Sequence, residues 1–185
     1  MPRSRCARLL ACLGPAAAAL ALHAAPAHAE TALEREVKAT YLYKLAPFVD
    51  WPLRAFASPS APVVICIVGD DPFGPTLDQA VEGKTRGARP IVARRLERAG
   101  ADSGCHIMYL AGSRQQSVAE ALHAVEGDAV LTVTDSEPAE RRGMVNFVRQ
   151  ENRVRFEIDE ASARQCGVAI SAKLLELAVA VRRKS

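Results

Sequence analysis

The sequence predicts an α/β sandwich of three layers, in which a mostly parallel sheet of about six strands carries helices on both faces. Residues 63–74 give the first indication: an unbroken apolar run that ends in glycines, aspartates and a proline is typical of a strand buried on both faces. A strand and helix rhythm up to residue 134 predicts parallel crossover connections. Two alternating segments after residue 142 then predict a late antiparallel hairpin.

The first 29 residues have the features of a secretory signal peptide. Arg3, Arg5 and Arg8 form a basic start, residues 9–22 form an apolar core, and small residues lead to a predicted cleavage site after Ala29. The core is too short to span a membrane, and an uncleaved anchor is the alternative. We therefore expect an exported, soluble protein that does not itself span the membrane.

The remaining residues, 30–185, are predicted to form a single domain, since no linker divides them. The whole chain has 24 basic and 21 acidic residues, and three arginines leave with the signal, so the mature chain has no net charge. A neutral chain without a dense basic stripe gives no indication of nucleic-acid binding. Cys66, Cys105 and Cys166 remain in the mature chain and allow at most one internal disulfide bond.

The first half of the mature chain is predicted to begin with a helix over residues 32–47. Thr31 and Glu34 form a capping-box pattern, and apolar residues follow at helical spacing until Pro47 and Pro52 end the helix. The elements predicted next are the buried strand at 63–69, a short helix at 75–81, a turn at 83–87 and a short strand at 89–93.

The second half continues this alternation and then changes pattern. The predicted crossovers continue with a strand at 105–110, a helix capped by Ser113 that runs to about residue 125, and a strand at 129–134. The predicted hairpin joins residues 143–149 to residues 153–158. The elements predicted after it are a short helix capped by Asp159, a brief strand at 168–170, and a last helix that starts at Ser171 and carries an apolar stripe to Val181.

The mature chain carries no catalytic motif, and we expect it not to be an enzyme and to hold no cofactor or metal. Its two histidines, His106 and His123, fall in a predicted strand and a predicted helix. Asp70 and Asp71 resemble a catalytic site with paired carboxylates, but acids before a proline at a strand end usually cap the turn that follows. A small-molecule receptor is an alternative, because open α/β sheets bind ligands beyond the carboxyl ends of their strands.

Seven segments, taken together in order and spacing, resemble the YfiR-like family of periplasmic proteins. They are residues 37–52 (VKATYLYKLAPFVDWP), 65–74 (ICIVGDDPFG), 104–111 (GCHIMYLA), 130–135 (VLTVTD), 143–147 (GMVNF), 154–159 (VRFEID) and 166–178 (CGVAISAKLLELA). The resemblance implies a periplasmic regulator that binds the extracytoplasmic domain of a membrane-bound diguanylate cyclase and inhibits it, lowering cyclic di-GMP and biofilm formation. The resemblance leaves open whether the protein forms a homodimer. The alternative is a periplasmic small-molecule sensor that acts on a histidine kinase or another membrane receptor.

The resemblance also implies a disulfide bond between Cys66 and Cys105, where members of the family have a cross-linked pair. The bond is physically plausible, because the first and third strands of a doubly wound sheet are neighbours. A loop of this length would stabilise the fold by roughly 3 to 4 kcal/mol in the chain-entropy model. Two buried thiols are the alternative. The sequence departs from the family in having no cysteine between Cys105 and Cys166, where some members carry a second bridge.

We expect the partner to bind at the late hairpin and the strand after it. Phe147, Glu157 and Ile170 are the candidate contacts, because an apolar patch with one charge is the kind of surface that docks a partner. The alternative is that Phe147 and Ile170 fill the core.

Overall fold

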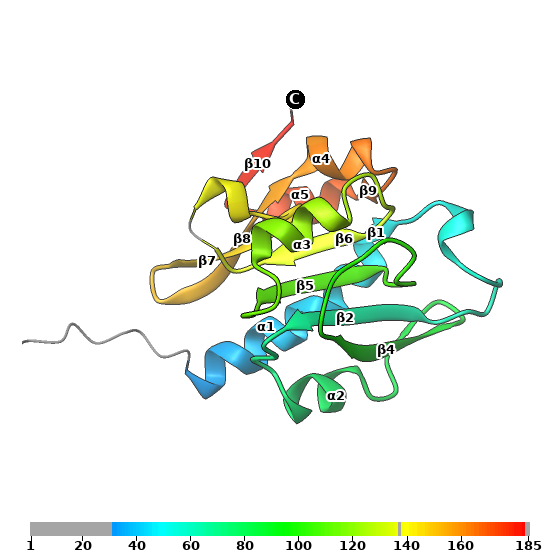
Figure 1. Cartoon of the computed structure of the whole chain (residues 1–185), viewed down its shortest axis with the longest axis horizontal. Coiled ribbons are helices and arrows are strands. Elements are labelled where there is room, and N and C mark those ends of the chain that lie inside the picture. Colours follow the sequence, from blue (N-terminus) through cyan, green and yellow to red (C-terminus); the bar gives the residue numbers. More distant parts are fainter. Residues whose placement is uncertain (1–30, 137, 184–185) are drawn as a thin grey trace, which may run out of the picture.

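The computed structural model describes residues 31–136 and 138–183 as one sandwich built on an eight-stranded sheet (Figure 1). The predicted signal peptide and the cleavage site after Ala29 lie outside the described residues. The predicted α/β fold with a mostly parallel sheet is confirmed, but the sheet has eight strands rather than about six. Its strand order is β10-β8-β7-β6-β5-β2-β4-β3.

Strand β2 (Val63–Gly69) lies inside the sheet, as its uniform hydrophobicity predicted. It pairs in parallel with β4 (Arg89–Leu96) on one side and with β5 (Ile107–Gly112) on the other. Side chains alternate between the two faces of a strand. Ile65 and Ile67 therefore join one hydrophobic cluster, while Cys66 and Val68 join a second cluster on the opposite face.

Helices cover both faces of the sheet. The cluster of Ile65 and Ile67 is closed by α1 (Ala32–Leu45) and α2 (Pro75–Val81), and the cluster of Cys66 is closed by α3 (Val118–Ala124). Helix α1 starts at the Thr31 cap as predicted and continues into a short 3-10 turn at Ala46–Phe48. Helix α3 starts later than predicted, because Ser117 and Glu120 form a capping box. The Ser113 hydroxyl instead accepts bonds from the amides of Gln115 and Gln116, in the turn that precedes the helix.

The second half of the sheet contains the predicted hairpin. Strands β6 (Leu131–Thr134) and β7 (Val145–Gln150) continue the parallel order, and β8 (Arg153–Asp159) returns antiparallel to β7. Two residues with positive φ, Glu151 and Asn152, form the turn between β7 and β8. At the other edge, the short strand β3 (Thr85–Arg86) is antiparallel to β4.

The C-terminal part differs most from the prediction. After α4 (Glu160–Gln165), β9 (Ala169–Ile170) pairs with β1 (Val49–Asp50) in a separate two-stranded sheet. The last helix, α5, covers Ala172–Leu177 and does not reach Val181; the chain instead forms β10 (Ala180–Arg182), parallel to β8. The strand satisfies backbone groups on the edge of β8 that a helix would leave without partners. Two further 3-10 turns cover Leu53–Ala55 and Ala139–Arg141.

None of the helices in the described part of the chain combines the length and the hydrophobicity needed to cross a membrane.

Candidate partner-binding site

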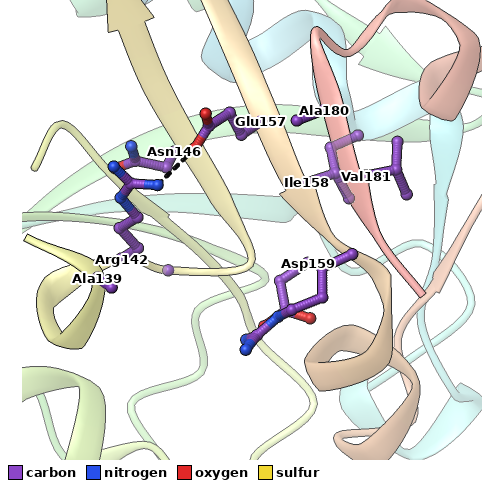
Figure 2. Close-up of a pocket in the computed structure, with 10 residues that line it drawn as sticks. Ala139, Arg142, Asn146, Glu157, Ile158, Asp159, Ala180 and Val181 are labelled. Atoms are coloured by element: carbon purple, nitrogen blue, oxygen red, sulfur yellow. Dashed lines mark hydrogen bonds and ion pairs between the residues drawn. The ribbon is translucent and has the colours of Figure 1, made fainter. Parts of the chain in front are cut away.

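Glu157 lies on a face of the sheet formed by three adjacent strands. The register places Asn146 of β7, Glu157 of β8 and Ala180 of β10 in one row, so their side chains share a face. The Glu157 side chain is 31% exposed, and its carboxylate accepts a hydrogen bond of 2.8 Å from the guanidinium of Arg142. Figure 2 shows this ion pair as a dashed line beside Asn146.

The row of residues lines a cavity of about 530 Å³ between the 3-10 turn at 139–141 and strand β10. A second ion pair, between Asp159 of β8 and Arg182 of β10, forms another part of its wall. Asp159 also accepts a bond of 3.1 Å from the Ser162 amide and thereby caps α4. The cavity therefore carries two carboxylates and two guanidinium groups, which suits a polar partner surface with charges of both signs.

Asn146 lines the cavity with a side chain that two hydrogen bonds hold in place. The residue is only 2% exposed, and its side-chain oxygen accepts bonds from the hydroxyl of Thr134 (2.7 Å) and from the amide of Ser136 (3.1 Å). These two bonds fix the orientation of the amide group. Its Nδ2 has no hydrogen-bond partner in the described part of the chain. Because Nδ2 is itself buried, this donor is covered in the structure rather than open to the cavity.

The structure does not bring Phe147, Glu157 and Ile170 together on one surface. Phe147 is 2% exposed and points to the opposite face, where its ring packs near Tyr41 and Tyr109. Ile170 is 9% exposed and pairs with Val49 in the two-stranded sheet. The expected apolar surface patch is thus corrected: both apolar residues fill the core, and Glu157 alone lies at the surface.

Sequence reasoning missed Arg142 and Asn146, which accompany Glu157 in the cavity. A signal for Asn146 was present, because a two-residue turn at 151–152 fixes the register that pairs Asn146 with Glu157. Arg142 had no comparable signal. It follows a 3-10 turn, and its position over β8 depends on how that turn packs on the sheet.

The structure contains the disulfide bond between Cys66 and Cys105. Their Cα atoms are 5.8 Å apart, and both residues are almost fully buried. The bond joins β2 to the segment that leads into β5. The guanidinium of Arg94, from β4 on the other side of β2, lies 3.6 Å from the sulfur of Cys66 and 3.4 Å from that of Cys105. Cys166, the third cysteine among the described residues, is a free thiol of intermediate exposure.

The family model DUF4154, described as YfiR/HmsC-like, matches residues 35–179 of the chain. The chain belongs to the YfiR/HmsC-like family. A comparison with curated proteins found no match.

Two groups with catalytic potential have structural roles in this YfiR/HmsC-like chain. The Asp71 carboxylate accepts a bond of 2.7 Å from the Phe73 amide and also pairs with Arg95, so it holds the turn after β2. His106 is buried, and its Nδ1 accepts a bond of 3.1 Å from the amide of Val64. No group of histidines, cysteines or acids able to hold a metal ion occurs among residues 31–136 and 138–183.

Proposed function

We propose that this protein is a periplasmic regulator that binds the extracytoplasmic domain of a membrane-bound diguanylate cyclase and keeps the enzyme inactive. The observation that carries the proposal is the YfiR/HmsC-like family match, which spans almost the whole described chain. The regulator would act by binding alone and would not catalyse a reaction. By binding only the inactive arrangement of the cyclase, it shifts the population of the enzyme away from its active state.

We propose that the cavity around Glu157 is the surface that contacts the cyclase. Its ion pairs lie at the protein surface, where side chains remain available to a partner; Glu157 and Arg142 are 31% and 38% exposed. A partner that brings complementary charges gains orientation and specificity from such pairs.

The test replaces Glu157 by arginine in cells that lack the chromosomal copy of the gene. We expect deletion to raise cyclic di-GMP, the unchanged protein to restore the low level, and Glu157→Arg to fail to restore it, because a second guanidinium beside Arg142 repels rather than pairs. Cyclic di-GMP is measured by mass spectrometry of cell extracts, and the amount of protein by immunoblot.

Glu126→Arg is the matched control, since the Glu126 side chain is 76% exposed and lies outside this cavity. It is expected to restore the low level fully. The proposal fails if deletion leaves cyclic di-GMP unchanged. The contact surface alone fails if Glu157→Arg, at normal abundance, restores the level as well as the control does.

A further inference from the structure

Strand β8 has an outer edge that only part of β10 covers. Strand β10 pairs with residues 157–159, so residues 153–156 extend beyond it toward the hairpin turn. The Val179 amide donates a bond of 2.9 Å to the Phe156 carbonyl, which shows that the backbone groups of Phe156 face this edge. Hydrogen-bonding direction alternates along a strand, so Val154 faces the same way. Among the described residues, β10 pairs with β8 only from Glu157 onward, so no strand pairs with the outward-facing N–H and C=O of Val154.

A groove with both apolar and charged lining residues runs beside this open edge, between β8 and the first turns of α1. The groove has a volume of about 650 Å³, and Leu33, Val37, Tyr41 and Val154 supply its apolar lining. Leu33 is 69% exposed, so a large apolar side chain of this groove meets solvent. The ion pair between Arg149 of β7 and Glu34 of α1 fixes the helix beside the hairpin, whose tip lies near the start of α1 in Figure 1.

The opposite face of the same edge is basic. Arg153 and Arg155 flank Val154 in the sequence, so their side chains leave the strand toward the opposite face, although both residues also line the groove at this edge. Both side chains are exposed, and neither forms an ion pair with a described residue. A strand laid against this edge would therefore meet apolar side chains on one face and guanidinium groups on the other.

We propose that the edge of β8 over residues 153–155 binds an extended segment of another protein in which apolar and acidic residues alternate. The segment adds a strand to the sheet by bonding to the backbone of Val154, as in β-augmentation. Its apolar side chains enter the groove beside Leu33 and Tyr41, and its acidic side chains lie across from Arg153 and Arg155.

A second copy of this chain suits the edge less well. Pairing the edge with itself would bring Arg153 and Arg155 of one copy opposite the same arginines of the other, and like charges directly opposite destabilise a sheet. The proposal concerns a surface other than the Glu157 cavity and does not depend on the partner being a cyclase.

The test measures binding of two fluorescein-labelled peptides to the protein purified from cells that express the full chain. One peptide has the alternating core EVEVE, the other has the same residues as EEEVV, and both carry Gly/Ser flanks. By fluorescence anisotropy we expect EVEVE to bind about tenfold more tightly, because it alone places acids and valines on opposite faces. Its affinity should fall as salt is raised, since the arginine contacts are exposed.

Three variants locate the binding. Val154→Pro removes the edge N–H, a change that edge strands tolerate, and is expected to abolish EVEVE binding. Leu33→Asp on α1 and the double variant Arg153→Glu, Arg155→Glu should each weaken it about fivefold or more. Arg114→Glu, at an exposed arginine outside the groove, is the control and should bind normally.

Equal affinity for the two peptides, or normal EVEVE binding by both Leu33→Asp and the double arginine variant, would overturn the proposal even if Val154→Pro fails to fold. A protein that elutes as a dimer, and as a monomer after Leu33→Asp, would assign the edge to a second copy and overturn it as well.

Discussion

A buried ring shows how one residue depends on its surroundings. His106 is 3% exposed, stacks on Phe56 with ring centroids 4.2 Å apart, and accepts the Val64 amide proton at Nδ1. That acceptor requires a neutral ring. Burial lowers the pKa of His106, the charges of Arg89 and Arg86 lower it further, and only the carbonyl of Ala55 acts in the opposite direction.

The pKa of His106 is lower in the folded chain than in the unfolded chain. The contribution of the neutral ring to the free energy of unfolding is therefore fully present above about pH 6.5 and is lost as the pH falls below it. We expect the free energy of unfolding in urea to decrease between pH 6.5 and 5 by at most about 1.4 kcal/mol per pH unit.

His106→Asn should flatten this slope, because the asparagine oxygen can still accept the Val64 bond but does not titrate. His123→Gln is the control for the loss of a histidine, because the His123 side chain is 85% exposed. The pKa of Glu34 is also lowered: burial opposes this shift, and the neighbouring Lys38 and Arg149 outweigh it. Protonation of Glu34 therefore lowers the stability of the fold only below about pH 4.5, outside this window. An equal slope in His106→Asn would contradict the assignment.

At the scale of elements, the backbones of β2 and β5 lie close together where both strands end. Gly69 has a φ of +87°, and a Cβ there would lie 2.4 Å from the carbonyl oxygen of Gly112. The Asp70 amide donates a bond of 2.9 Å to that same oxygen. Two central strands can therefore end side by side only with a glycine at position 69.

Gly69→Ala and Gly127→Ala separate steric overlap from backbone strain. Gly127 has a φ of +85°, but no atom lies within 4 Å of the position that a Cβ would take, so its substitution adds conformational strain alone, about 1 to 2 kcal/mol. Gly69→Ala adds overlap with a backbone atom, for about 1 to 3 kcal/mol more. Denaturant unfolding of both variants measures the difference. Equal losses would show that the strand ends move apart freely.

Local sequence signals predicted most elements, and failed where two signals competed or where a distant strand decided. Ser113 and Ser117 are both good helix caps, and only the reciprocal bonds with Glu120 select Ser117. The stripe from Leu174 to Val181 is compatible with a helix. The chain nevertheless leaves the helix after Leu177, because β8 offers edge groups to residues 179–182, and no local pattern contains that information.

For the whole molecule, the disulfide bond acts on the unfolded chain. Cys66 and Cys105 are 39 residues apart and close a loop that includes α2, β3 and β4. Cross-linking such a loop lowers the entropy of the unfolded state, an effect independent of local packing. The bond also joins a strand of the sheet centre to the segment before its neighbour, so its contribution belongs to the fold as a unit.

We expect the double variant Cys66→Ala, Cys105→Ala to lose roughly 3 to 4 kcal/mol of unfolding free energy. The unchanged protein with the bond reduced should show a similar loss, which separates the cross-link from packing. Cys166→Ala is the control and should lose far less, because Cys166 is a partly exposed free thiol. A reduced protein as stable as the oxidised one would contradict this expectation.

The sequence by itself determined the α/β class, the buried position of β2, the hairpin and the family resemblance, because periodicity, turn residues and ordered motifs are local properties. Tertiary structure alone decided that Phe147 and Ile170 are buried while Glu157 faces a cavity with Arg142, and that β10 leaves part of the β8 edge open. Exposure and strand order depend on which distant segments pack together, and such contacts are set by the whole chain.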